Sequence, residues 1–414
     1  MAMIFRDIPL FLFLFFSLYV QVFLLITFFE MRREKKRGGN IMSLLMDAPK
    51  VDIIVPCWNE EATLERTVDS LLNLEYPEGK LRIIVVNDGS TDRTGVIADN
   101  LAARFGSVTA LHKENGGKYT ALNLGLEYAT AQLVGCLDAD SFVSPGALKE
   151  IIPHFGNPKV MAVTPYITVH EPRGTLQRVQ SAEYVMSGFF LALLAALNAL
   201  FVTPGPFSIY RKAVFERIGG FRSGHHTEDL EMAFRMQANR MKIENASGAR
   251  VATIAPSSFS SLMRQRVRWH YGFLNNALDY RRLIARPGFG HLGFFILPGG
   301  VISIFAALFL AAVSVFDGLS RLRNFVVETL TVGFRFGQLH FEWFFFNTSV
   351  FSLVTFFVLA VFLFLFLSSR WFADGKFRLP KNGVWYLLLY GFLAPVWYAR
   401  AVYAALTART VFWR

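Results

Sequence analysis

Long stretches without a charged side chain decide most of what this chain can fold into. The first, Ile8–Phe29, holds 22 residues without a charge and is followed by the basic sequence MRREKKR. About 20 apolar residues in a helix are enough to cross the hydrocarbon core of a bilayer. Because the basic residues 32–37 follow the run, the pattern predicts a retained anchor with a cytoplasmic basic end, and not a cleaved signal peptide.

Three further apolar runs fit a membrane span: Gly293–Phe316, Trp343–Ser369 and about Gly383–Ala399. The loop between the last two is basic, which favours the cytoplasmic side. We therefore expect an N-terminal transmembrane helix in residues 1–30, a cytoplasmic domain in residues 31–292, and a C-terminal membrane region in residues 293–414 with about three transmembrane helices. Both ends of the chain would then lie outside the cell membrane, in a multi-pass protein.

A fifth apolar run, Tyr184–Tyr210, has no charge over 27 residues, so hydropathy alone would predict another span. Acidic motifs lie on both sides of this run, and a single crossing would separate them. Pro204, Gly205 and Pro206 also interrupt the run. We therefore predict interfacial helices at about 180–210 and 258–285, the first of them buried in the domain or lying at the membrane surface.

Between the apolar runs, short strand-like segments alternate with helical ones. Strands are expected in VDIIVPCWNE, LRIIVVNDGSTDRT, VTALHK and QLVGCLDAD, and helices in ATLERTVDSLLNL, TGVIADNLAARF and KYTALNLGLEYA. This alternation predicts a mostly parallel sheet with helices on both faces. Ligands bind such sheets at the carboxyl ends of the strands. Asn59, Glu60, Asp88, Asp138 and Asp140 all fall there, and they are the first candidates for a site.

Three motifs at these strand ends suggest particular ligands. In LDAD, Asp138 and Asp140 are two residues apart, so both carboxylates can reach one Mg²⁺ or Mn²⁺ ion; a turn pair is the alternative. In NDGSTD, Asp88 can accept a hydrogen bond from a base, although the same loop can also form an Asx turn that caps the next helix. In NGGK, two glycines before Lys118 suit an anion, or form an ordinary turn.

The sequence HHTEDLEMAFRM begins with a capping residue and continues as an amphipathic helix. Thr227 is the expected N-cap, which places Glu228 and Asp229 in the first turn. Asp229 then suits a general base for an acceptor hydroxyl, while a helix-dipole role is the alternative for both acids. Zinc at His225 and His226 is not favoured, because no second group of ligands follows at zinc spacing.

The sequence RQRVRWHYG places Gln265, Arg268 and Trp269 at positions i, i+3 and i+4 of a helix, on one face. The guanidinium and the amide suit a diphosphate that departs with negative charge, and the indole suits stacking on a sugar. Arg264 and Arg266 fall on other faces, where we expect them to reach lipid headgroups.

Taken in order, VPCWNEE, NDGS, NGGK, LDAD, TED and QRVRW resemble the motifs of the family 2 glycosyltransferases over roughly residues 51–272. The resemblance is closer to the membrane-integrated synthases of hyaluronan, cellulose, chitin and poly-N-acetylglucosamine. It implies an α/β GT-A (Rossmann-like) cytoplasmic domain fused to an α-helical transmembrane region. It also implies a UDP-sugar donor, inverting transfer to a growing polysaccharide, processive synthesis coupled to export, and Mg²⁺ or Mn²⁺.

The resemblance also assigns roles to residues. Those expected to bind the nucleotide sugar are Pro56, Asn59, Glu60, Asp88, Lys118, Asp138, Gln265, Arg268 and Trp269. Metal binding falls to Asp138 and Asp140, and catalysis to Asp229 with Glu228. The acceptor is expected at Gly205, Pro206, Phe207 and Trp269.

Other functions stay open at this point. One is transfer of a single sugar to a polyprenyl phosphate or another lipid, since four spans are few for a polymer channel. Another is a transporter or non-catalytic sugar-nucleotide binder, which the nearly uncharged spans disfavour. The net charge of the chain is +11, and its basic residues flank the predicted spans. This placement fits contact with membrane lipids better than binding to nucleic acid. We expect a lipid-linked or polysaccharide acceptor, a possible homo-oligomer, and two free cysteines, Cys57 and Cys136.

Overall fold

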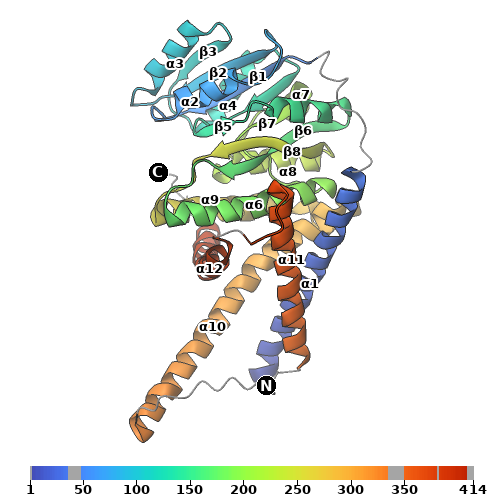
Figure 1. The fold of residues 1–414 in the computed structure, drawn as a ribbon, viewed down its shortest axis with the longest axis vertical. Helices are drawn as coiled ribbons and strands as arrows, with labels where there is room; N and C mark the ends of the chain where they lie inside the picture. The colour runs from blue at the N-terminus through green and yellow to red at the C-terminus, as the bar shows by residue number, and fades with distance from the viewer. Residues whose placement is uncertain (1, 36–47, 334–348, 380–381, 408–414) are drawn as a thin grey trace.

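The structure is a computed structural model that describes residues 2–35, 48–333, 349–379 and 382–407. An α/β domain lies above a layer of crosswise helices, and long apolar helices project from that layer (Figure 1). Trp343, Arg335 and the end of the basic cluster after Lys35 lie outside the described residues, so the predictions made for them stay predictions.

One eight-stranded sheet forms the centre of the domain, in the order β3-β2-β1-β4-β7-β6-β8-β5. Strands β1, β2, β3 and β4 are parallel, as the alternation predicted, whereas β7 runs antiparallel to β4 and β6. The strands are β1 (Val51–Cys57), β2 (Leu81–Asp88), β3 (Val108–Lys113), β4 (Leu133–Cys136), β5 (Ser141–Val143), β6 (Val160–Val169), β7 (Ser208–Arg211) and β8 (Lys242–Thr253).

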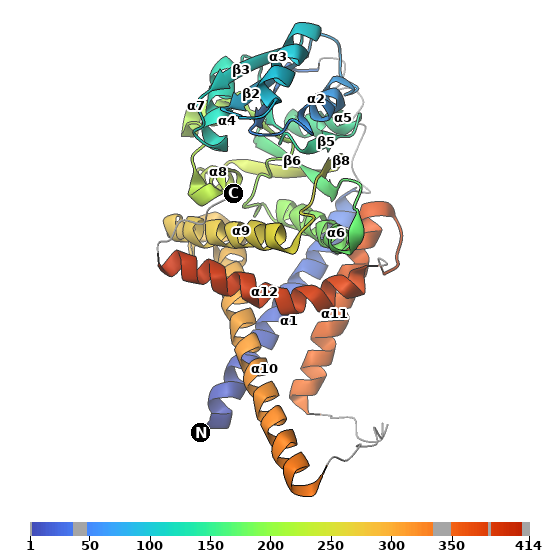
Figure 2. The same cartoon turned by 90° about the vertical axis from the view of Figure 1, so that its left-hand side faces the viewer.

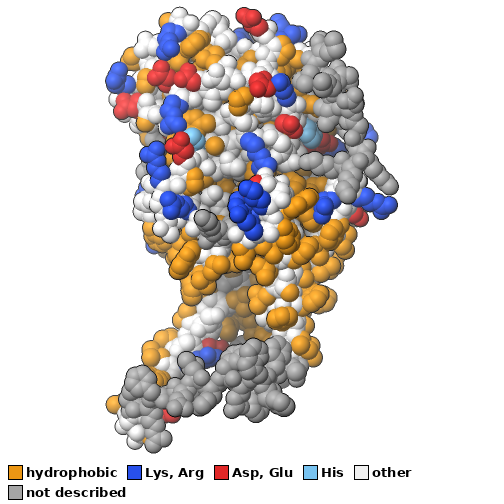
Figure 3. All heavy atoms as spheres, viewed as in Figure 1, with side chains coloured by type: hydrophobic (Ala, Val, Ile, Leu, Met, Phe, Trp, Pro, Cys, Tyr) orange, Lys and Arg blue, Asp and Glu red, His pale blue; other side chains and the backbone are white. Residues whose placement is uncertain are grey.

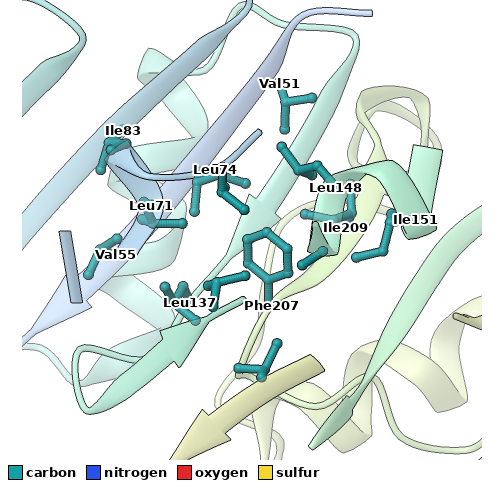
Figure 4. Close-up of a cluster of buried hydrophobic side chains, with 14 of the residues drawn as sticks. Val51, Val55, Leu71, Leu74, Ile83, Leu137, Leu148, Ile151, Phe207 and Ile209 are labelled. Atoms are coloured by element: carbon teal, nitrogen blue, oxygen red, sulfur yellow. The ribbon is translucent and has the colours of Figure 1, made fainter. Parts of the chain in front are cut away.

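Helices cover both faces of this sheet, which explains why its central strands are continuous apolar runs. On one face, α2 (Leu64–Leu72), α3 (Thr94–Arg104) and α5 (Ala147–Ile151) pack on the side chains of Val51, Ile53 and Val55. Figure 4 shows part of this core, with Phe207 at its centre. On the other face, α4 (Lys118–Tyr128), α7 (Lys212–Ile218) and α8 (Glu228–Ala238) pack on Ile54 and its neighbours.

The fifth apolar run forms helix α6 (Gly174–Ala196), a loop, and then strand β7. Because Ser208 to Arg211 pair with β4 in the central sheet, the far end of this run lies inside the domain. The acidic motifs before and after the run are therefore parts of one folded unit. Helix α6 itself lies flat under the sheet and contacts β6 and β8 (Figure 1).

Among the described residues, five helices are long and apolar enough to cross a membrane. They are α1 (Ala2–Lys35), α6, α10 (Leu297–Val332), α11 (Val350–Asp374) and α12 (Gly383–Leu406). Figure 2 shows that α12 runs crosswise to α1, α10 and α11 and lies directly below α9 (Phe259–Asp279). The composition of α12 predicted a membrane span, but the helix runs in a different direction from α1, α10 and α11. It is held there because Tyr390 and Trp397 are buried against α9.

The apolar and charged side chains occupy different parts of the molecule. In Figure 3, the lower helices carry mostly hydrophobic side chains, most acidic and basic side chains lie on the upper domain, and a group of Lys and Arg side chains lies where the two regions meet. Two contacts fix the upper ends of the projecting helices. Arg250 of β8 donates a hydrogen bond to the carbonyl of Ala373 at the end of α11 (2.9 Å), which attaches α11 to the domain. Arg32 of α1 lies 4.2 Å from the ring of Trp371 of α11, which joins these two helices to each other.

Candidate active site

The loops that follow β1 and β2 hold each other at the carboxyl end of the sheet. The amide N–H of Asn59 donates to Ser90 Oγ (3.0 Å), and the N–H of Thr91 donates back to Asn59 Oδ1 (2.9 Å). Asn59 adopts a positive φ of 56°, a conformation that asparagine tolerates better than most residues. The side chains of Asn59 and Glu60, predicted to bind the donor, therefore also shape the loop, since Glu60 Oε2 accepts from Thr63 Oγ1.

Asp88, at the end of β2, organises the glycine loop of the NGGK motif. Its carboxylate, which is nearly buried, accepts hydrogen bonds from Lys113 Nζ (2.6 Å), Gly116 N (3.1 Å) and Gly117 N (2.9 Å). Asp92, a few residues on, accepts from Thr94 N (2.9 Å) as an Asx turn does. The two aspartates of this loop thus have different roles, and Asp88 positions the loop that precedes Lys118.

Lys118 joins acids from two separate motifs. It is the first residue of α4, and its Nζ lies 2.5 Å from Asp138 Oδ1 and 2.9 Å from Glu228 Oε1. Burial favours the neutral amine, but the carboxylates of Asp138 and Glu228 outweigh it and hold the pKa of Lys118 well above its ordinary value. Lys118 therefore keeps its positive charge in the centre of the site, where a phosphate would need one.

Gly205 lies directly over this ion pair. A Cβ atom at this position would come within 2.6 Å of Lys118 Nζ and within 2.8 and 2.9 Å of the two carboxylate oxygens of Asp138. The sequence analysis placed Gly205 near the acceptor; the structure places it against the Lys118–Asp138 pair. Only a glycine leaves this pair in its present position.

We therefore expect Gly205→Ala to lower sugar transfer about 10- to 100-fold while the protein stays folded, because the new methyl group displaces Lys118 and Asp138. Activity assays and thermal unfolding would be measured together. Gly146→Ala is the matched control, since a Cβ there meets no atom within 4 Å and the backbone φ is −84°. Equal activity of the two variants would contradict this role of Gly205.

Two acids at the start of α8 differ in their proton affinity. Burial acts to raise the pKa of Glu228, but the Lys118 ammonium and Arg268 outweigh it, so the pKa of Glu228 is lowered. For Asp229, burial and the neighbouring Glu228 charge raise the pKa to about 6. Such a split between adjacent carboxylates is typical of acid–base sites. It leaves Glu228 as the ionised partner of Lys118 and gives Asp229 the stronger basicity.

The predicted N-cap of α8 is only partly confirmed. Thr227 does precede the helix, but its hydroxyl donates to the carbonyl of Gly224 and makes no capping bond. Asp229 accepts from its own neighbour Leu230 N (2.8 Å). His225 pairs with Asp279 (2.8 Å), and the carbonyl of His226 accepts from Arg268 (2.7 Å), so both histidines have structural partners.

Helix α9 brings the QRVRW motif beneath these acids. Arg268 faces Glu228, Asp229 and Asp138. Burial lowers the pKa of Arg268 below its usual value, although these three carboxylates act to raise it. The prediction for Arg266 was wrong: its side chain is only 2% exposed and pairs with Glu183 of α6 (2.5 Å) instead of reaching lipid headgroups. Glu183 was not predicted; the sequence signal was a single acid next to a long apolar run.

The acceptor residues predicted around Gly205 separate in the structure. Phe207 is completely buried, with its ring in the hydrophobic core (Figure 4), and its N–H donates to the carbonyl of Cys136 (2.8 Å). Its side chain therefore holds the sheet together and does not face an acceptor. Pro206 stays half-buried beside Gly205, and Pro56 lies within β1, paired with Val86 of β2. Cys57 and Cys136 are free and buried, as predicted.

The carboxylates after β4 suit a divalent cation. Burial, with the charges of Asp138 and Glu60, raises the pKa of Asp140 to about 7, which is the behaviour of a carboxylate that needs a positive partner. Within the described residues, no group of three or more His, Cys, Asp or Glu side chains could enclose an ion. Asp138 and Asp140 thus fit an ion such as Mg²⁺ or Mn²⁺ whose other ligands are phosphate oxygens and water.

Comparison with known proteins identifies the class of this domain. Residues 52–219 match the family model described as Glycosyl transferase family 2. This part of the chain is therefore a family 2 glycosyltransferase domain, and the GT-A-like fold and the predicted resemblance are confirmed. The match ends before Glu228, so the α8 acids and the α9 motif lie beyond it.

The names of two relatives indicate two different kinds of product, a polysaccharide and a glycolipid. The chain is 29% identical to "Poly-beta-1,6-N-acetyl-D-glucosamine synthase" of Staphylococcus epidermidis over 261 residues. These residues cover 63% of this chain and 63% of that one. It is 29% identical over 246 residues to "Beta-monoglucosyldiacylglycerol synthase" of Nostoc sp., covering 58% of this chain and 53% of that one. The matches thus span less than two thirds of the relatives' lengths.

A solved structure shares the fold over nearly the whole chain. "Mannosyltransferase PcManGT from Pyrobaculum calidifontis in complex with GDP-Man and Mn2+" superposes with a TM-score of 0.63 at 17% identity, covering 97% of this chain and 99% of that one. The superposed length includes the helices below the domain, so the shared fold extends beyond the sheet.

Proposed function

We propose that this protein transfers a sugar from a nucleoside diphosphate sugar, with UDP as the expected nucleotide, to a hydroxyl group at the membrane surface. The observation that carries the proposal is the cluster of Lys118, Asp138, Glu228, Asp229 and Arg268. It combines two fixed positive charges for a diphosphate with a carboxylate of raised pKa for a proton. The family 2 domain and the two named relatives support the same class of reaction.

The mechanism follows from the placement of these groups. Asp229 removes the proton of the acceptor hydroxyl as its oxygen attacks the anomeric carbon. The bond from that carbon to the diphosphate oxygen breaks, and Lys118 and Arg268 stabilise the charge on the departing nucleotide. Attack opposite the leaving group inverts the anomeric centre. Glu228 keeps Lys118 in place, and Trp269 contributes an aromatic face for the acceptor sugar.

Asp138 and Asp140 would hold the divalent cation, which when bound neutralises charge on the diphosphate oxygens. Mg²⁺ and Mn²⁺ both suit two carboxylate ligands with phosphate oxygens. The Mn²⁺ named with the mannosyltransferase PcManGT supports this proposal. Asp88 contributes indirectly to donor binding, because its hydrogen bonds order the glycine loop next to Lys118.

The pKa of Asp229 predicts how activity depends on pH. A general base must be deprotonated, and burial beside Glu228 raises the pKa of Asp229 to about 6. Transfer should therefore be nearly constant above pH 7 and fall about tenfold for each unit below about pH 5. Rates would be measured at saturating donor over this range. A profile that stays flat to pH 4 would contradict Asp229 as the base.

The same proposal includes a membrane topology. Helices α1, α10 and α11 cross the bilayer, while α6, α9 and α12 lie at its inner surface beneath the catalytic domain. Lys and Arg side chains at the boundary in Figure 3 then face the cytoplasm, which agrees with the positive-inside rule. Because α12 does not cross, the sequence-based topology of four spans becomes three, with the N-terminus outside and residues after α11 inside.

The projecting helices favour a lipid-anchored acceptor over a growing polymer. In Figure 1, α10 diverges from α1 and α11 toward its lower end, so within the described residues these three helices do not form a closed bundle. Apolar side chains along α10 stay exposed, among them Val315 (61%), Phe316 (68%) and Leu319 (62%). An opening to the bilayer suits an acceptor that arrives within it. Polysaccharide synthesis, supported by the poly-N-acetylglucosamine synthase relatives, is the second candidate.

Product size decides between these acceptors. The full chain would be placed in lipid nanodiscs with Mg²⁺ or Mn²⁺ and radiolabelled UDP-N-acetylglucosamine, UDP-glucose or GDP-mannose. The expected product is one labelled species that extracts into organic solvent with the lipids. A high-mass product digested by a glycosidase would support polysaccharide synthesis instead. Absence of transfer from any of the donors to any added acceptor would contradict the proposed function.

A further inference from the structure

The most deeply buried charge in the crosswise layer is Arg266, which the mechanism above does not use. Its side chain is only 2% exposed, yet it links α9, on which it lies, to α6 through Glu183 and from there to α12. Arg266 Nη2 donates to Glu183 Oε2 of α6 (2.5 Å), and the hydroxyl of Tyr390 of α12 donates to the same oxygen (2.6 Å). These three side chains, Arg266, Glu183 and Tyr390, are called the α6–α9–α12 network below.

The network ends on two residues of the candidate site. Arg266 Nη1 donates to Gln265 Oε1 (2.7 Å), and the Arg266 guanidinium lies 4.3 Å from the ring centre of Trp269. A planar guanidinium that is fixed at both ends defines the plane and position of whatever stacks on it. The orientation of Trp269 and of the Gln265 amide therefore depends on Glu183 and, through it, on Tyr390.

Stability alone does not account for this arrangement. Removing two charges from water costs about as much as their attraction returns, so a buried ion pair adds little net stability compared with apolar side chains of the same size. The helices α6, α9 and α12 meet in an apolar cluster that includes Met263, Val267 and Trp397, so an apolar replacement would have apolar neighbours. What an apolar pair would lose is the directed contact with Gln265 and Trp269.

We propose that Tyr390, Glu183 and Arg266 are positioning residues that fix Trp269 for the acceptor. The inference rests on the proposed function, in which Trp269 faces the acceptor sugar. It assigns α12 a specific part in the reaction: a helix at the membrane surface sets the geometry of the acceptor side of the site. Donor binding, which depends on Lys118, Asp138 and Arg268, does not pass through the network.

Tyr390→Phe tests this directly, because it removes one hydroxyl and keeps the ring. Tyr386→Phe is the matched control. Tyr386 lies one turn earlier on α12, its ring is 4.8 Å from that of Tyr390, and within the described part of the chain its hydroxyl makes no hydrogen bond. We expect Tyr390→Phe to raise the acceptor KM about tenfold and leave the donor KM unchanged. Tyr386→Phe should change neither.

Two further measurements separate positioning from general destabilisation. Acceptor KM would be measured with diacylglycerol in phosphatidylcholine nanodiscs and with tri-N-acetylglucosamine. In a protein that already carries Trp269→Phe, adding Tyr390→Phe should not change the acceptor KM further. The fluorescence contribution of Trp269, taken as the difference between the protein and its Trp269→Phe variant, should shift with Tyr390→Phe. Glu183→Gln should reproduce both effects if Tyr390→Phe folds poorly.

The positioning role and the proposed function would fail on different results. Equal loss of donor and acceptor binding, additive effects of Tyr390→Phe and Trp269→Phe, or an unchanged Trp269 signal would each overturn the positioning role. If the wild-type protein transfers no sugar, the proposed function fails, whereas the fluorescence comparison still shows whether Tyr390 controls the environment of Trp269.

Discussion

Asp229→Asn should lower the rate of sugar transfer by about 10²- to 10⁴-fold, the usual contribution of a positioned general base. The amide has nearly the same shape as the carboxylate but cannot accept the proton of the acceptor hydroxyl. Nucleotide binding should persist, because Lys118 still has Asp138 at 2.5 Å and Glu228 at 2.9 Å as partners. Calorimetry with UDP and a radiolabel transfer assay measure the two properties on the same sample.

Asp99→Asn is the control for that experiment. Asp99 lies on α3, its side chain is 65% exposed, and its partner is His112, so the change removes an exposed carboxylate that is paired with none of the candidate site residues. Transfer by Asp99→Asn should equal that of the wild type. Wild-type turnover by Asp229→Asn would remove Asp229 from the mechanism and leave Glu228 as the acid to examine next.

Asp140→Asn and removal of divalent cations should both weaken UDP binding and sugar transfer strongly. If Asp138 and Asp140 hold the cation, chelation with EDTA should abolish transfer and weaken UDP binding more than about tenfold, and Mg²⁺ or Mn²⁺ should restore both. Asp140→Asn should show the weakened binding even with the cation present, because a neutral amide is a poor ligand for a hard cation.

Asp92→Asn serves as the matched change for this test, since Asp92 belongs to a neighbouring loop and accepts hydrogen bonds from Thr94 and Glu61. Its UDP binding should respond to EDTA as the wild type does. UDP binding that is indifferent to EDTA in the wild-type protein would show that Lys118 and Arg268 alone hold the diphosphate.

The parts of this fold set by local pattern could be predicted from the sequence. Strands β1 and β2 are continuous apolar runs ending in polar loops, and helices α3 and α4 begin at the residues expected for them. The position of Asp138, Asp140 and Asp88 at strand ends follows from the same pattern. The motifs of α8 and α9 were found because short spacings fix which residues share a helix face.

The parts set by long-range contacts could not be predicted. Arg266 and Glu183 are 83 residues apart, and Tyr390 is 207 residues from Glu183, so no local pattern connects them. Helix α12 has the composition of a span, and only its packing on α9 shows that it runs crosswise. Phe207 follows a Pro-Gly-Pro sequence and was expected at the acceptor, but its position just before the short strand β7 places its ring in the core.

Helix α6 has a consequence for how the protein is made. Insertion machinery selects nascent segments by hydrophobicity, and α6 meets the length and composition of an inserted segment. Insertion would strand the residues of β7, which must pair with β4, on the wrong side of the bilayer. The buried Gln177 and Gln180, which donate to the carbonyls of Ala255 and Pro256, together with Glu183, make α6 costly to place in lipid. The same polar groups that hold α6 in the domain therefore also protect it from misinsertion during synthesis.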